Sequence, residues 1–194
     1  MSLIYLFKNY FQQKMPPAIR HLHITVMLLI IAQIIISNFI EVERDGKIGT
    51  EIIEFYATWL HFIVGLILVP LIITFVTLEF KRHGFAYFYP YLSGNFDQLS
   101  KDIKQLLSFK LPEAQPHGLA AIIQGLGLGA VLLVVVSGLS WFIGWRVNSS
   151  WEHDIKELHE LLTGLVEAYL IGHGIVGVLH IWLTKPNTES TANK

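Results

Sequence analysis

The sequence predicts an all-α membrane protein, and its composition gives the first support. Apolar residues make up 53% of the 194 residues and charged residues only 15%, whereas about 25% of the residues of a soluble domain are charged. The apolar residues gather in four long stretches, and crossing the hydrocarbon core of a bilayer takes roughly 20 such residues in a helix. Lysine and arginine lie mostly between these stretches. We therefore expect a polytopic four-transmembrane-helix bundle.

The four expected spans differ in their polar content. The first two contain no Asp, Glu, Lys or Arg, although Pro70 lies inside the second. The third has no histidine and is rich in small residues that favour close helix packing, among them Gly125, Gly127 and Gly129, so we expect it to be the structural helix. The fourth contains His159, Glu167, His173 and His180. In order, the spans are residues 22–40, 55–78, 118–145 and 158–183.

The distribution of lysine and arginine predicts on which side of the membrane the loops lie. Ten of the 14 belong to the N-terminal segment, to the connection between the second and third spans, or to the C-terminal tail. The other two connections together hold four. Because cytoplasmic segments carry the excess of positive charge, we expect both termini to be cytoplasmic.

Three segments make up the expected domain organisation. Residues 1–21 form an N-terminal interfacial segment, residues 22–183 the transmembrane domain and residues 184–194 a flexible cytoplasmic tail. The transmembrane domain includes a cytoplasmic amphipathic insertion at about residues 84–117. In it, apolar residues recur at helical spacing, opposite Asp97, Lys101, Asp102 and Lys104. We expect this helix to lie in the membrane interface, with docking on a partner subunit as the alternative.

The composition also excludes several kinds of site. The chain has no cysteine, which excludes disulfides, thiolate zinc sites, iron–sulfur clusters and attachment of haem through cysteine. The formal net charge is −1, so no basic excess indicates a nucleic-acid partner. The nine histidines remain the most informative residues, because an ionisable residue inside a membrane is rare and usually functional.

Two histidines of the fourth span lie on one helix face at different depths. His159 and His173 are 14 residues apart, which is close to four turns and about 21 Å along the helix axis. They cannot bind the same ion, but each can bind a separate centre. The second span runs in the same direction and places His61 at the depth of His159. The first span places His23 at the depth of His173, and His21 competes with His23 for this position.

The sequence therefore predicts an outer and an inner histidine pair, as two bis-histidine haems b stacked across a bilayer would require. Haem b is held by two imidazoles without covalent bonds, so the absence of cysteine is no obstacle. Gly65 and Gly177 follow His61 and His173 by four residues and share a helix face with them. We expect these glycines to leave room for the macrocycle, with close helix packing as the alternative.

Three further residues have predicted roles. We expect Arg20 and His180 to contact haem propionates at the inner surface, with an interfacial cap as the alternative for His180. Glu167 lies in mid-span, where an ionised carboxylate is costly, so we expect it to be neutral. Either a proton relay coupled to redox change or a hydrogen bond to a neighbouring helix would account for it.

These motifs resemble the bacterial cytochrome b561 family, which includes the cytochrome b subunits of nickel–iron hydrogenases and related dehydrogenases. The resemblance covers residues 18–183. It rests on the histidine that opens the first span (Arg20 to His23), the His61-x-x-x-Gly65 motif, and His159-Glu160 followed by His173. It implies a multi-pass protein of the bacterial cytoplasmic membrane that contains two haems b per chain, with ligands at His23, His61, His159 and His173.

The resemblance also implies electron transport in a respiratory chain, between quinone or quinol and a second redox partner. That partner would be a dehydrogenase or hydrogenase subunit or a soluble cytochrome, and whether the chain is itself an enzyme stays open. One alternative is a superoxide:quinone oxidoreductase, but that branch has an arginine and a histidine where this chain has Phe75 and Gln124. The other is a haem-free metal transporter, which would place its ligands together near mid-membrane.

Overall fold

The computed structural model describes residues 15–42 and 47–183, with side chains as far as Leu179. Within these residues the chain is helical and contains no strand. Four helices are long and apolar enough to cross a membrane, which confirms the predicted fold class; the side on which the termini lie stays a prediction. The N-terminal interfacial segment, through residue 14, and the C-terminal tail lie outside the described residues. The four long helices are α2 (Pro17–Ser37), α3 (Ile52–His83), α6 (Leu119–Arg146) and α7 (Glu152–Leu183).

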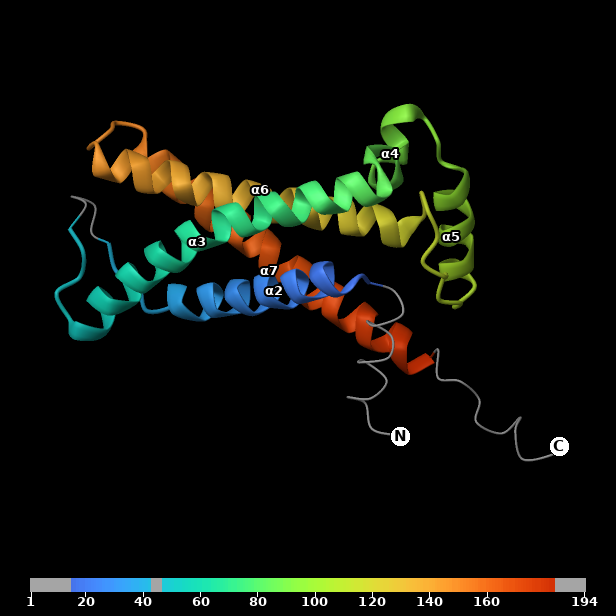
Figure 1. Ribbon diagram of the computed structural model, residues 1–194, viewed down its shortest axis with the longest axis horizontal. Helices are drawn as coiled ribbons and strands as arrows, with labels where there is room; N and C mark the ends of the chain where they lie inside the picture. Colours follow the sequence, from blue (N-terminus) through green and yellow to red (C-terminus); the bar gives the residue numbers. More distant parts are fainter. Residues whose placement is uncertain (1–14, 43–46, 184–194) are drawn as a thin grey trace.

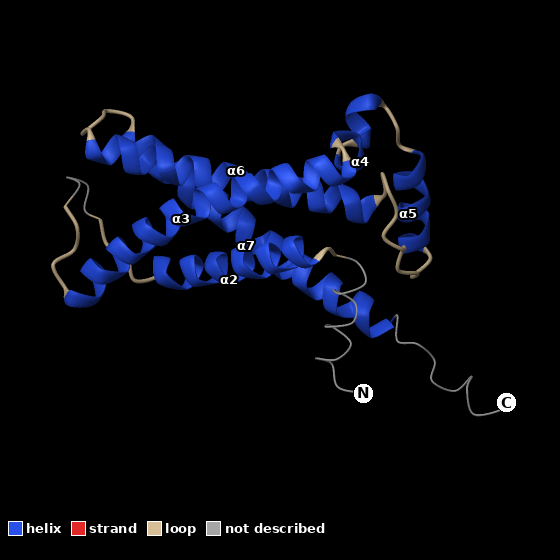
Figure 2. Ribbon diagram, in the orientation of Figure 1, coloured by secondary structure: helices blue, strands red, loops and turns tan. Residues whose placement is uncertain are grey.

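The four long helices run along the length of the molecule and cross one another (Figure 1). α2 packs along α3, α6 packs along α7, and α3 packs against α6. The short elements α4 (Phe85–Phe88), η1 (Pro90–Ser93) and α5 (Asp97–Leu107) gather at one end, which we call the α5 end. The connections from α2 to α3 and from α6 to α7 lie at the opposite end, which we call the connection end. Figure 2 shows the connecting loops between the helices at these two ends.

A buried apolar cluster joins all four long helices. Burial of such side chains removes apolar surface from the surroundings and fixes the helices by close packing. Val166, the member of the cluster on α7, lies halfway between His159 and His173, so the cluster occupies the middle of the bundle. Its members are Val26 and Ile30 of α2, Leu68, Ile72 and Val76 of α3, Ala130 of α6 and Val166 of α7.

Helices α3 and α7 extend beyond the spans that the sequence predicts. α3 begins with a capping box, in which the side chains of Glu51 and Glu54 each accept a hydrogen bond from the other residue's backbone. It continues through Pro70, and the hydroxyl of Thr74 donates to the Pro70 carbonyl over 2.7 Å. α7 begins at Glu152 with acidic residues in its first turn. Hydropathy detects only the apolar part of such helices, so the polar first turns were not included in the expected spans.

At the α5 end, α4 packs tightly against the start of α6. A Cβ atom at Gly125 would lie 2.7 Å from the Cβ of Phe88, so only glycine permits this approach. The Tyr89 hydroxyl donates to the Gly125 carbonyl over 2.7 Å. Burial raises the pKa of Tyr89 above its usual value, which keeps the phenol protonated as a donor. The small residues of α6 therefore serve close packing, as the sequence predicts.

The position of Asp102 in α5 differs from the expectation. The sequence pattern places Asp102 on the polar face, but its side chain is buried, with 1% of the residue exposed. Its carboxylate accepts hydrogen bonds from the backbone N–H of Leu119 over 2.7 Å and from the Gln98 side chain over 2.8 Å. A carboxylate at a helix N-terminus satisfies a free N–H group and interacts favourably with the helix dipole. Asp102 thus attaches α5 to the first residue of α6.

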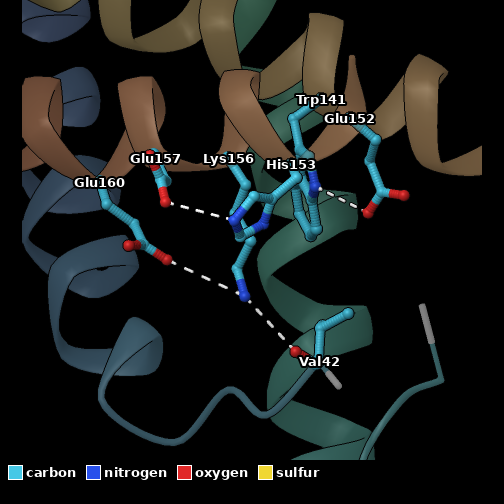
Figure 3. Close-up of polar contacts among 7 residues, drawn as sticks. All are labelled: Val42, Trp141, Glu152, His153, Lys156, Glu157 and Glu160. Atoms are coloured by element: carbon cyan, nitrogen blue, oxygen red, sulfur yellow. Dashed lines mark hydrogen bonds and ion pairs between the residues drawn. The ribbon is translucent and has the colours of Figure 1, made fainter. Parts of the chain in front are cut away.

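Polar contacts at the connection end fix the start of α7 (Figure 3). The Lys156 ammonium donates to the Val42 carbonyl over 3.4 Å and lies 4.0 Å from the Glu160 carboxylate. The Trp141 indole N–H donates to the Glu152 carboxylate over 3.3 Å. These contacts connect α7 to the segment after α2 and to the end of α6, and so hold the helix turn that precedes His159.

Two facing histidine pairs as candidate haem sites

The structure brings four histidines together as two pairs. The imidazole of His61 on α3 lies opposite that of His159 on α7, with 6.3 Å between the ring centres. The imidazole of His23 on α2 lies opposite that of His173 on α7, with 6.4 Å between the ring centres. His21 is exposed. Both expected pairings are therefore present as neighbouring side chains, while their role as ligands stays a prediction.

The separation within each pair is suitable for a metal between the two rings. A ligating imidazole nitrogen lies about 2 Å from the metal and about 1 Å from the centre of its own ring. Two imidazoles on opposite sides of one metal therefore have ring centres roughly 6 Å apart. The observed 6.3 Å and 6.4 Å agree with this value.

A pocket surrounds the His61–His159 pair. Together with the solvent at its open side, it takes in about 770 Å³ of empty space. All four long helices contribute to its walls, and the walls are mainly apolar. Besides the two histidines, Gly65 and Thr163, the lining residues include Ile34 and Gln33 of α2, Phe62 and Leu66 of α3, Val135 and Trp141 of α6, and Val166 of α7.

Hydrogen bonds fix the orientation of the His159 ring. Its Nδ1 lies 3.0 Å from the carbonyl oxygen of Val134 and 3.1 Å from the hydroxyl oxygen of Ser137. The Ser137 hydroxyl itself donates to the same Val134 carbonyl over 2.9 Å, so the Nδ1–H of His159 is the donor to both oxygens. Its Nε2 then carries the lone pair, which is the form of histidine that ligates a metal.

Glycines give the His61–His159 pair its space. A Cβ atom at Gly138 of α6 would lie 2.8 Å from Cε1 of His159, so this ring position requires glycine. A Cβ atom at Gly65 would lie 3.3 Å from the side-chain nitrogen of Gln33, which donates to the His61 carbonyl over 2.8 Å. Gly65 lines the pocket, and its role beside a macrocycle stays a prediction.

Sequence reasoning missed the contribution of α6 to this pair. The third span was expected to be only structural, yet Val134, Ser137 and Gly138 orient and accommodate the His159 ring. The available signal was the adjacent Ser137 and Gly138 in an otherwise apolar stretch. It could not be assigned to His159 without the relative rotation of α6 and α7.

The His23–His173 pair has aromatic neighbours instead. The His23 ring lies 5.7 Å from the Phe75 ring of α3. The His173 ring stacks on Tyr169 of the same helix, with 5.3 Å between ring centres and 17° between planes. Tyr169 in turn lies directly against Gly127, where a Cβ atom would overlap its ring. The second pair is therefore positioned by aromatic ring contacts, of which the Tyr169–His173 contact is a stack.

Other predicted site residues lie at varied distances from the pairs. Arg20 is half-buried one turn before His23, and Gly177 is half-buried one turn after His173, with open space where its Cβ would lie. The side chain of His180 is outside the described residues. Glu167 is exposed and does not line the His61–His159 pocket. Haem contacts for the first three and a proton relay for Glu167 stay predictions.

The donor sets fit haem b. Each pair offers two imidazoles, and the described residues contain no group of three or more His, Cys, Asp or Glu that could hold a metal ion. Haem b requires two ligands from the protein, because the porphyrin supplies the other four ligands of the iron.

Comparison with known proteins agrees with this geometry. No curated protein and no solved structure matches the chain. The family described as prokaryotic cytochrome b561 matches residues 14–190, which include all four long helices and both histidine pairs. The match covers most of the chain, and we conclude that the chain belongs to the prokaryotic cytochrome b561 family.

Proposed function

We propose that the chain holds two haems b and transfers electrons across the membrane from one histidine pair to the other. Membership of the family supports a membrane b-type cytochrome in electron transfer. The proposal goes further in the number of haems and in assigning their ligands. The observation that carries it is the presence of two imidazole pairs, at 6.3 Å and 6.4 Å, separated along α7 by almost four helical turns.

The side chains around each pair have distinct tasks in this proposal. A bound haem supplies an iron that gains and loses one electron. His159 is held by Val134 and Ser137 with its Nε2 directed to ligation. The apolar walls of the pocket exclude water. Since each iron would have two protein ligands in addition to the porphyrin, neither would have a free position for oxygen, so electron transfer is the expected chemistry.

We further propose that the chain exchanges electrons with the quinone pool and with a redox partner, such as a hydrogenase or dehydrogenase subunit or a soluble cytochrome. The positive charges of the connection from α3 to α6 and of the terminal segments support cytoplasmic termini. The His61–His159 pair would then be near the outer surface and the His23–His173 pair near the cytoplasm. Phe75 lies against His23, where the superoxide oxidase branch has an arginine, and this favours electron transfer over superoxide chemistry.

The test is haem quantification with single histidine variants. We expect two haems b per 22.1 kDa chain in the purified protein and a reduced-minus-oxidised spectrum with two components. His61→Ala and His159→Ala should each remove one component, and His23→Ala and His173→Ala should each remove the other. His153→Ala is the matched control, because His153 is exposed and its imidazole lies 3.2 Å from the Glu157 carboxylate at the surface. Retention of both haems in His173→Ala would overturn the proposal.

A further inference from the structure

The side of α7 that faces away from the histidine pairs is exposed through the depth of the membrane. In the most apolar window of α7 only 6% of the residues are buried, against 22–28% in the other three long helices. His159, Val166 and His173 mark the side of α7 that faces the bundle, so haems bound by these histidines would leave the opposite side uncovered. The exposed residues of this side include Leu161, Gly164, Ala168, Ile171 and Ile175, and the exposed Glu167 lies at its edge, about 100° around the helix from Val166.

Glu167 is the residue that a lipid environment does not explain. It lies between the two ligand positions, about 12 Å along the axis from His159 and about 9 Å from His173, and thus near the middle of the hydrocarbon core. Its side chain is exposed, and within the described residues no hydrogen bond or ion pair of its carboxyl group is present. A carboxyl group facing hydrocarbon without a partner is unfavourable even when it is protonated. A further polar group must therefore meet it in the membrane.

Small residues beside Glu167 allow another helix to approach. Gly164 and Ala168 are one turn apart, both are exposed, and they occupy the centre of the outward side. No atom lies within 4 Å of the position that a Cβ would take at Gly164. Two small residues with this spacing let helix backbones come close in membranes, where polar side chains then hydrogen-bond across the contact.

We propose that α7 forms a parallel two-fold interface between two copies of this chain, centred on Gly164, Glu167 and Ala168. Copies in one membrane share their orientation, so a two-fold axis along the membrane normal places Glu167 level with its equivalent. A protonated carboxyl group both donates and accepts hydrogen bonds, so two such groups satisfy each other. Glu167 is exposed and does not line the His61–His159 pocket, which favours this contact over a proton relay.

Cysteine cross-linking tests the interface directly, because the chain has no cysteine of its own. Ala168→Cys, in the haem-loaded protein in membranes, should form a disulfide-linked species of twice the chain mass on mild oxidation, since facing Cα atoms at such a contact lie within the roughly 7 Å that a disulfide spans. Leu133→Cys is the control. Leu133 lies on α6 and is 55% exposed. The Leu133→Cys protein should therefore stay monomeric under the same conditions.

Two substitutions of Glu167 separate its hydrogen bond from its size. Glu167→Leu should weaken dimerisation by about three- to thirtyfold, the range expected for one interhelical hydrogen bond in a membrane. Glu167→Gln should retain the dimer, because an amide also donates and accepts. Gly164→Ile should abolish it by blocking backbone approach. Spectra of all variants should be unchanged, which distinguishes failure of the interface from failure of the haem assignment.

Three results would overturn the proposal. One is a monomeric Ala168→Cys protein under conditions that cross-link Leu133→Cys. Another is equal dimerisation of Glu167→Leu and the unsubstituted chain. The third is the finding that the chain does not bind a second copy of itself and instead binds a different membrane protein through α7.

Discussion

The two histidine pairs have similar ring separations but are positioned in different ways. The His61–His159 pair lies in a pocket formed by all four long helices, and its His159 ring is fixed by the hydrogen bonds that it donates to α6. The His23–His173 pair is positioned by ring contacts with Phe75 and with a tyrosine of α7. The first site therefore depends on backbone spacing and hydrogen bonds, and the second on the packing of aromatic rings. Substitutions in α6 can therefore be chosen to disturb one site and leave the other unchanged.

The largest effect should come from enlarging Gly138. We expect Gly138→Leu to displace the His159 ring, since even a Cβ at this position would lie 2.8 Å from it, and to reduce haem content from two to one per chain. The component that disappears should be the one lost in His159→Ala. Gly129→Ala is the control, because its Cβ would make only an ordinary 3.7 Å contact with the Tyr89 hydroxyl. Loss of both components in Gly138→Leu would mean that the sites are not independent.

A smaller effect on the other pair should follow from Gly127→Ala. The new methyl group would overlap the Tyr169 ring, and the stacked His173 ring would have to move with it. Overpacking of this kind typically costs about 1–3 kcal/mol, so haem affinity at the His23–His173 pair should fall by roughly five- to 150-fold. Haem titration of each spectral component measures this. An effect on the His61–His159 component alone would contradict the comparison.

The smallest effect should come from Ser137→Ala. This substitution removes one of the two oxygens near Nδ1 of His159 but leaves the Val134 carbonyl. Groups that orient a metal-bound histidine usually contribute about 10- to 100-fold to affinity, and with one acceptor retained we expect at most about tenfold. Ser140→Ala, one helical turn further along α6, is the matched control. If Ser137→Ala and Ser140→Ala bound haem with equal affinity, the Ser137 contact would not orient the ring.

The sequence was sufficient to predict four spanning helices and the two pairs of neighbouring histidines, while the depth of each histidine in a membrane stays a prediction. Depth follows from residue number along a helix, because each residue adds a fixed rise. The choice between His21 and His23 could not be made in this way. They lie two residues apart, on different sides of α2, and only the packing of α2 against α3 and α7 brings His23 to His173.

Contacts between helices could not be predicted for the same reason. Hydropathy gives the position of a span but not its rotation about its own axis. Asp102 was assigned to the polar face of α5 from periodicity, whereas docking on α6 turns it inward toward the N–H of Leu119. The contact of Gly138 with His159 likewise depends on the rotation of α6 against α7.

The apolar cluster in the middle of the bundle has an electrical consequence under the proposed function. Its seven side chains, which include Val26, Ile72 and Val166, contain no ionisable group. An electron that moved past them would cross without a compensating proton. Each turnover would therefore transfer net charge across the bilayer. Moving one elementary charge through the full membrane potential involves about 2.3 kcal/mol per 100 mV. The rate of transfer between the two halves of the protein should therefore respond to membrane voltage.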